Sequence, residues 1–188
     1  MNLHEAIHTR RAVRAYKPDI VDEATLRQLL QEAIQAPSAM NAQPWVFSIV
    51  QDRARLRRYS DLAKSQMLKA NVTEPKVRSY ADILRDETFN IFYDAGTLIA
   101  IGVRARTEFS EADGWLAAQN LMLTASEAGL GTCCIGFAVS VLNLPDIKRE
   151  LGIPEEGAVV APIIIGYPSA SPPPVVRNGP YIGAWLRE

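Results

Sequence analysis

The stretch SEADGWLAAQNLMLTASEAGLGTCCIG, residues 110–136, decides the fold. Its first two-thirds predict one helix, capped by Ser110 with Asp113 three residues on in capping-box spacing. Apolar residues fall at helical spacings on most sides of this helix, which predicts burial in a core or against another subunit. Gly129 and Gly131 end the helix, because glycine adopts the left-handed conformation at a helix C-terminus without steric cost.

A short apolar segment, Thr132 to Gly136, follows the helix and predicts a strand or a turn. Gly136 lets another group approach the backbone closely, because it carries no side chain. The segment is therefore either a wall for a flat cofactor or an ordinary tight turn behind a core helix. The residues alone leave both interpretations open.

The composition predicts a globular protein with a single domain over residues 1–188. Hydrophobic residues make up 48% of the chain and charged residues 22%, and the net charge is -1. This balance argues against a nucleic acid or a membrane surface as a partner recognised by bulk charge. No apolar run approaches the roughly 18 residues of a membrane span. The N-terminus has no secretory apolar core, so we expect a cytoplasmic protein.

The cysteines and histidines favour neither a disulfide framework nor a metal centre. Cys133 and Cys134 are adjacent, and such a pair has the spacing of neither a disulfide scaffold nor a zinc site. The sequence contains two histidines, His4 and His8, which are too few for a histidine-based metal centre. We therefore expect no metal.

The N-terminal part of the chain predicts a short helix followed by a basic run. Asn2 begins the helix in a capping box, and the apolar residues expected to face inward are Leu3, Ala6 and Ile7. Residues 10–18 then hold four cations within a nearly neutral chain. This run is either a solvated surface or a local anion site, and the forked guanidinium of arginine suits a phosphate.

A second helix, capped by Asp22, leads into the loop APSAMNAQPW, residues 36–45. Two prolines and several small residues predict an ordered loop. Ser38, Asn41 and Gln43 either donate to a polar ligand or satisfy the backbone groups of the loop itself. The second use is the commoner one for serine and asparagine in turns.

The remaining regular elements are predicted from hydrophobic patterns. Three buried strands are expected over 45–50, 97–103 and 159–166, and further helices after Asp52 and over 144–151. Pro162 marks the last strand as an edge strand or a bulge, because proline cannot donate a ladder hydrogen bond.

The sequence patterns of two segments do not predict burial in a hydrophobic core. Residues 70–95 lack clear periodicity, and we interpret them as a partly helical lid or substrate-facing insertion. Residues 167–188 form a proline-rich tail that ends in an apolar cluster. Because this tail has no core of its own, we expect it to pack on another surface, such as a second subunit.

Four stretches together resemble the FMN-dependent nitroreductase family: RRAVRAY (10–16), APSAMNAQPW (36–45), GLGTCCIGF (129–137) and IGYP (165–168). The resemblance implies an α+β fold with a mixed, mainly antiparallel sheet flanked by helices. It further implies an intertwined homodimer, in which the long helix packs at the interface and the C-terminal tail crosses onto the partner.

The resemblance also implies a flavin site between two chains. Arg10 and Arg177 match contacts to the phosphate and ribityl chain, and Arg14 matches a cation near the pyrimidine edge of the ring. The backbone around Ile135 and Gly136 matches donors to the reactive nitrogen of the ring and its neighbouring carbonyl. Pro37, Ser38 and Asn41 match contacts to the flavin of the other subunit, where Gln43 orders their loop. The cofactor-binding stretches also include Arg11, Ala12, Ala39 and Cys134.

Some positions depart from the family pattern. Ala12 stands where many members have a serine, and Cys134 where an aromatic residue or proline is frequent. Ile135 replaces an acidic residue, and Val175 stands where a second tail cation is often found. These departures bear on the substrate and on the flavin potential more than on flavin binding.

The implied function is transfer of hydride from NADH or NADPH to FMN and then to nitroaromatic, quinone or other electron-poor acceptors by a ping-pong mechanism. No side chain need act as a nucleophile or general base, because the flavin carries the chemistry. One alternative is a specialised relative that fragments flavin or acts in dehalogenation. Another is a non-enzymatic dimeric protein that binds flavin or another anion, and a minor one is a redox pair of Cys133 and Cys134.

Overall fold

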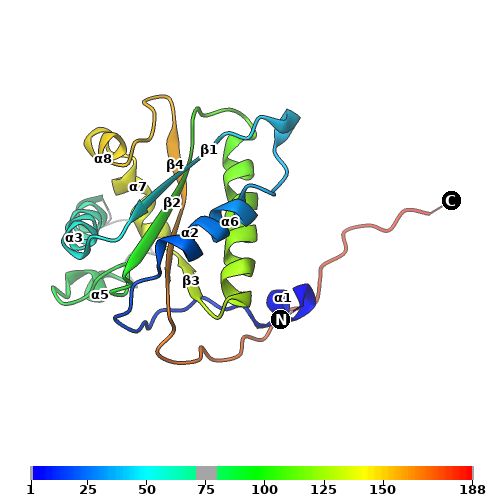
Figure 1. Cartoon of the computed structure of the whole chain (residues 1–188), viewed down its shortest axis with the longest axis horizontal. Helices are drawn as coiled ribbons and strands as arrows, with labels where there is room; N and C mark the ends of the chain where they lie inside the picture. The colour runs from blue at the N-terminus through cyan, green and yellow to red at the C-terminus, as the bar shows by residue number, and fades with distance from the viewer. Residues whose placement is uncertain (1, 71–79, 188) are drawn as a thin grey trace.

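A four-stranded antiparallel sheet forms the centre of the fold in the computed structural model, which describes residues 2–70 and 80–187 (Figure 1). The strand order is β1-β2-β4-β3. The strands are β1 (Trp45–Val50), β2 (Thr97–Val103), β3 (Gly131–Cys134) and β4 (Ala158–Gly166). All three ranges predicted as strands are confirmed, but only β2 and β4 are buried throughout, because β1 lies at the edge of the sheet and its Ile49 is exposed.

Helices cover both faces of the sheet (Figure 1). On one face lie α2 (Glu23–Ala33) and α6 (Ser110–Glu127), and on the other α3 (Arg53–Ala70), α7 (Val139–Leu142) and α8 (Pro145–Glu150). The other helical elements within the described residues are α1 (Leu3–Thr9), α5 (Ala81–Arg85), η1 (Ala39–Asn41) and η2 (Gly136–Ala138). This arrangement confirms the α+β class with helices flanking an antiparallel sheet.

The side chains of β2 alternate between the two faces of the sheet and so contribute to the apolar core on each face. Leu98 and Ala100 belong to the apolar cluster under α3 and α7, whereas Ile99 and Ile101 belong to the cluster under α2 and α6. Successive side chains of a strand point to opposite faces of its sheet, so a strand buried on both faces is apolar throughout. All seven residues of β2 are buried accordingly.

The expectation that Pro162 marks an edge strand is wrong, because β4 lies between β2 and β3. The carbonyl of Pro162 accepts from the N–H of Ile135 at 2.8 Å, just past the last residue of β3. The missing N–H of Pro162 therefore faces the end of a neighbouring strand rather than its middle. A register shift of the β2–β4 ladder, between Ile101 and Gly102, confirms the irregularity predicted nearby.

The predicted capping box of the long helix is also wrong. Phe109 is the N-cap of α6, and Ser110 Oγ instead accepts from the N–H of Thr107 at 2.9 Å. The Asp113 carboxylate accepts from the N–H of Ala39, which lies 74 positions away in the sequence. The C-terminal end is as predicted, since α6 stops just before Gly129, whose φ is +75°.

Burial of α6 is one-sided within a single chain. Ala117, Ala118 and Leu121 are fully buried against α2 and the sheet, while Trp115 and Leu116 are 43% and 44% exposed. The helix therefore has an apolar face left over after it has packed on its own core.

The short N-terminal helix has the predicted capping box of Asn2 and Glu5. Its inward face is smaller than predicted, because Ala6 is buried whereas Leu3 and Ile7 are 68% and 52% exposed. A helix of seven residues that packs mainly on α6 has room for little more than one buried position.

The predicted lid is described in part by the structure, and the predicted tail is described up to residue 187. Of the predicted lid, 71–79 lie outside the described residues, and α5 lies within it. From residue 169 to residue 187 the tail has neither helix nor strand, and it extends away from the sheet in Figure 1. Its large apolar side chains are exposed, namely Val176, Tyr181, Ile182, Trp185 and Leu186. Within the described residues, no helix is long and apolar enough to cross a membrane.

The basic N-terminal segment lies along the open side of β3. Ala12 forms a parallel bridge with Thr132, and the N–H of Val13 donates to the Thr132 carbonyl at 3.0 Å. Further along, Tyr16 bridges Pro168 in antiparallel fashion. These contacts fix residues 12–16 against the end of the sheet.

Two paired glycines make this approach possible. Gly131 and Gly166 are partners across β3 and β4. A Cβ on Gly131 would lie 2.7 Å from the Cβ of Val13, and one on Gly166 would lie 3.0 Å from the Tyr16 ring. The N-terminal segment therefore packs directly on backbone that carries no side chain.

Replacing Gly131 by alanine is expected to lower the free energy of unfolding by about 1–3 kcal/mol, because the new methyl group overlaps Val13. The matched control is Gly136→Ala in the following turn, where a Cβ meets nothing within 4 Å. We expect that variant to stay within about 0.5 kcal/mol of the wild type. Urea unfolding of both variants measures the difference, and equal stabilities would contradict the proposed packing.

Candidate functional site

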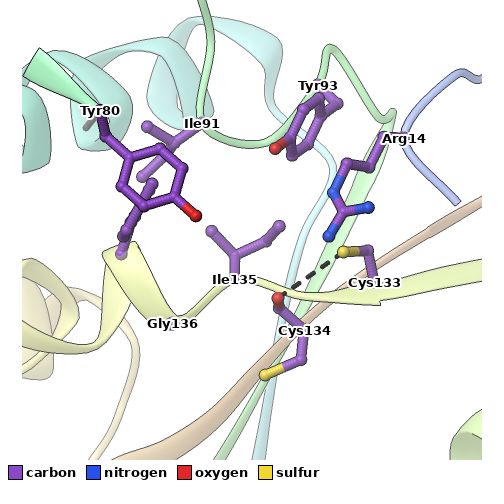
Figure 2. Close-up of a pocket in the computed structure, with 9 residues that line it drawn as sticks. Arg14, Tyr80, Ile91, Tyr93, Cys133, Cys134, Ile135 and Gly136 are labelled. Carbon is purple, nitrogen blue, oxygen red and sulfur yellow. Dashed lines mark hydrogen bonds between the residues drawn. The ribbon is translucent and has the colours of Figure 1, made fainter. Parts of the chain in front are cut away.

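A cavity of about 420 Å³ opens where β3 ends and η2 begins (Figure 2). Four segments meet there: the basic N-terminal run, the start of α5, the turn before β2 and the β3–η2 junction. The lining residues are Arg14, Tyr80, Ile91, Tyr93, Cys133, Cys134, Ile135, Gly136 and Phe137. One cation, three aromatic rings and a stretch of backbone thus surround one space.

The β3–η2 junction offers free backbone donors to this cavity. The N–H of Ile135 is used inside the sheet, where it donates to Pro162. The N–H groups of Gly136 and Phe137, by contrast, have no acceptor within the described part of the chain. Since a Cβ on Gly136 would meet nothing, the space over this backbone is open to a ligand.

Arg14 brings an uncompensated positive charge to the cavity. Its guanidinium forms no ion pair or hydrogen bond with a described residue, and it lies 5.8 Å from the centroid of the Tyr93 ring. Figure 2 shows the two side chains next to each other at the cavity, with Tyr80 across from them. An electron-rich group in the cavity would be the natural counterpart of this charge.

Arg10 and Arg11 line a second, smaller cavity of about 170 Å³ near the start of the tail. The guanidinium of Arg11 donates to the carbonyls of His8 and Arg10, which ties it to the local backbone. The pKa of Arg10 is lowered from its ordinary value by burial and then by the charges of Arg177 and Arg11. Three cations therefore gather at this point, and an anion would relieve their repulsion.

The two cavities are joined by one extended segment. Arg10, Ala12 and Arg14 alternate along it, so they occupy the same face, with the Ala12 backbone held by Thr132. At about 3.3 Å per residue, Arg10 and Arg14 stand about 13 Å apart along the chain. The arrangement suits an elongated ligand with an anionic group at one end and a flat ring at the other.

The loop predicted to contact the flavin lies elsewhere. Residues 36–45 sit at the N-terminal end of α6, whereas β3 and the cavity lie toward its C-terminal end (Figure 1). Pro37, Ser38, Ala39, Asn41 and Gln43 therefore do not share a cavity with Arg14 in one chain. The predicted site residues thus divide into two groups at opposite ends of one helix.

Within this loop, the polar side chains hold one another. Ser38 Oγ accepts from the N–H of Gln43 at 3.0 Å, and Gln43 Nε2 donates to Asn41 Oδ1 at 3.0 Å. Gln43 therefore orders the loop as predicted, and Ser38 serves a backbone group of the loop. The hydroxyl proton of Ser38 and the amide NH2 of Asn41 remain available to a ligand.

Several residues of the loop have unfavourable backbone conformations. Met40, Asn41 and Gln43 have φ of 50°, 55° and 46°, in the left-handed region that non-glycine residues rarely occupy. Asp113 on α6 anchors both ends, since its carboxylate accepts from Ala39 and its carbonyl from the Trp45 indole at 2.9 Å. Such strain persists only where surrounding contacts determine the conformation.

The two cysteines point away from each other. Cys133 packs in the core under α3 and α7, and Cys134 packs against the core under α6, as alternation along β3 requires. Burial raises the pKa of Cys133 above its ordinary value and that of Cys134 to about 11. Both thiols are therefore protonated near neutral pH, and the geometry gives no support to a redox pair.

Sequence analysis missed the aromatic wall of the cavity, formed by Tyr80, Tyr93 and Phe137. Tyr80 and Phe137 pack edge to face with ring centroids 5.5 Å apart. Tyr80 and Tyr93 lie in the segment without periodicity, where the alternation of charges and aromatic residues was the one available signal. Phe137 falls inside a quoted motif but was not assigned to the site.

Known proteins share the sequence pattern and the fold of this chain. The sequence model of the nitroreductase family matches residues 7–167. An NADH dehydrogenase from Thermus thermophilus is 30% identical over 179 residues, covering 85% of this chain and 83% of that protein. A 5,6-dimethylbenzimidazole synthase from Rhodospirillum rubrum is 34% identical over 174 residues, covering 87% and 81% respectively. A solved nitroreductase with bound FMN from Bacteroides fragilis superimposes over 100% of both chains with a TM-score of 0.83 at 23% identity.

The fold and these sequence matches thus define a protein of the nitroreductase class. The chain belongs to the nitroreductase family.

Removing the Asp113 carboxylate is expected to loosen the 36–45 loop. In Asp113→Ala, the Ala39 N–H loses its acceptor, which we expect to cost about 1–3 kcal/mol in the free energy of unfolding. Asp113→Asn keeps an acceptor oxygen and should lose less. Glu127→Ala removes the same charge from the exposed end of α6 and serves as the control, with a change within about 0.5 kcal/mol. Thermal unfolding and exchange of the Ala39 amide proton test this, and an unchanged exchange rate in Asp113→Ala would contradict it.

Proposed function

We propose that the protein is an FMN-dependent oxidoreductase that takes hydride from NADH or NADPH and passes it to an electron-poor acceptor such as a nitroaromatic compound or a quinone. The observation that carries the proposal is the row of Arg10 and Arg14 beside β3. It connects a cluster of cations to a cavity lined by aromatic rings and free backbone N–H groups. Membership of the nitroreductase family supports the same assignment.

The described residues fit FMN at both ends. The phosphate would lie at Arg10, where Arg177 and Arg11 add positive charge. The ring would lie in the cavity over Gly136, where no Cβ obstructs it. The three cations at one end satisfy a dianion, and the apolar wall at the other satisfies a flat ring.

When bound, FMN supplies the redox chemistry, accepting hydride from the nicotinamide and yielding it to the acceptor. Arg14 places a fixed positive charge beside the ring, which favours the more negative reduced form and raises its reduction potential. The N–H of Gly136 would donate to the bound flavin, and Phe137 and Tyr80 would shield one side of the cavity from water.

We further propose that the active form is a homodimer in which each site uses two chains. In this arrangement, the loop 36–45 of one chain reaches the flavin held by Arg10 and Arg14 of the other. The exposed Trp115 and Leu116 on α6, together with the exposed apolar tail, supply surface for the contact. In the dimer, the two groups of site residues at opposite ends of α6 would come together, one from each chain, to form a complete flavin site.

A second candidate is a specialised reaction of bound flavin, such as its fragmentation. The observation in its favour is the 34% identity to the dimethylbenzimidazole synthase from Rhodospirillum rubrum. A dehalogenase-like reaction belongs to the same class of alternatives. The two classes differ in what a reduced nicotinamide does to the bound flavin.

The visible absorption spectrum of the purified protein distinguishes these functions. We expect a flavin spectrum that bleaches when NADH or NADPH is added under argon, because the nicotinamide reaches the ring through the cavity. Addition of a nitroaromatic compound or a quinone should then restore the oxidised spectrum. Flavin that stays oxidised with both nicotinamides would favour the specialised reaction, and a protein that binds no added FMN would overturn the proposal.

Truncation after Pro174 tests the role of the tail. We expect the truncated chain to lose the dimer or to release FMN, because the exposed apolar side chains of the tail and Arg177 are removed together. The full-length Arg177→Ala variant is the control and should stay dimeric while binding FMN more weakly. Light scattering and flavin content measure both properties. A truncated protein that remains dimeric and retains flavin would show that the tail does not join the subunits.

A further inference from the structure

The turn before β2 holds its conformation against the preference of its residues. Tyr93 and Asp94 both have φ of 52°, in the left-handed region. Neither residue is glycine, so each is strained, and two in succession require strong support from their surroundings. Backbone strain of this kind is common at functional sites, so the side chain that this turn holds at the cavity is a candidate for a functional role.

Asn90 supplies most of this support. Its side chain is nearly buried, and its Oδ1 accepts from the N–H of Phe92 at 2.9 Å while its Nδ2 donates to Asp94 at 2.9 Å. Its carbonyl accepts from the N–H of Tyr93 at 2.8 Å. The adjacent Ile91 N–H donates to the buried Ser60 Oγ on α3 at 3.0 Å, which fastens the turn to the core.

This turn determines the position of the Tyr93 ring. The ring is held at its edge by Phe89, with centroids 5.7 Å apart, and it faces the Arg14 guanidinium at 5.8 Å. Figure 2 shows Tyr93 beside Arg14, with its hydroxyl directed toward the cavity. Arg14 has no ion pair or hydrogen bond within the described chain. The Tyr93 ring therefore restricts its guanidinium through an aromatic contact, beside the nearby Cys133 thiol.

We propose that Tyr93 is a positioning residue that holds the Arg14 guanidinium at the cavity, with the Asn90 turn as its support. This inference rests on the proposed FMN function, in which Arg14 stabilises reduced flavin. The negative face of an aromatic ring attracts a guanidinium, so the ring fixes the cation without neutralising it. A carboxylate in the same place would also fix Arg14 but would cancel the charge that the reduced flavin needs.

The test compares Tyr93→Phe, which keeps the ring, with Tyr93→Leu, which removes it. FMN is added to the full-length proteins, and its dissociation constant and reduction potential are measured. We expect Tyr93→Phe to match the wild type. Tyr93→Leu should lose about threefold in the preference for reduced over oxidised FMN. That factor equals about 14 mV lower potential for a two-electron couple.

A double-mutant cycle separates this role from a merely structural one. In an Arg14→Ala background, Tyr93→Leu should cause no further shift in potential, because the side chain it positions is gone. Tyr80→Leu is the matched control: it removes a ring across the cavity, and its effect should add to that of Arg14→Ala. Should Tyr93→Leu fail to fold, Tyr93→Met keeps the side-chain bulk without the ring and serves in the same cycle.

The outcomes are distinguishable. Wild-type protein that binds no FMN would overturn the proposed function and this inference with it. Wild-type protein that binds FMN, combined with an unshifted potential in Tyr93→Leu, would overturn the positioning role alone. An equal shift in reduction potential on Tyr93→Leu in the presence and in the absence of Arg14 would also overturn the positioning role alone.

Discussion

The absence of two side chains, at Gly131 and Gly166, is the constraint on which the site depends. These paired glycines let the segment that carries Val13 and Tyr16 lie directly on the ends of β3 and β4. Once seated there, the segment extends past β3 with its alternate residues on one face, which spaces Arg10 and Arg14 along the edge of the sheet. The positions of both cations thus follow from a packing contact between small and large residues.

The sequence predicted the regular elements well because their signals are local. Apolar runs located all three predicted strands, and Gly129 located the end of α6. The failures involve partners that are distant in the sequence: Asp113 was assigned to a local cap but binds Ala39. Periodicity predicted that Leu3 and Ile7 face inward, yet they are 68% and 52% exposed.

The sequence predicted those site residues that belong to a recognisable motif, such as the arginines of residues 10–16. It did not predict residues that reach the site only through the folding of irregular segments. Tyr93 illustrates the second case, because a left-handed turn of non-glycine residues carries no composition signature. The turn exists because the Asn90 side chain binds two groups on either side of Tyr93. Tyr80 and Phe137 complete the aromatic wall beside the β3–η2 junction.

The division of site residues between the two ends of α6 has a genetic consequence. In the proposed dimer, every chain gives its loop to one site and its arginines to the other. A chain damaged in residues 36–45 and a chain damaged at Arg14 would each form inactive homodimers. Mixed in one cell, they would assemble heterodimers in which both lesions fall in the same site, leaving the second site entirely wild type. Two null alleles of this gene would therefore complement each other.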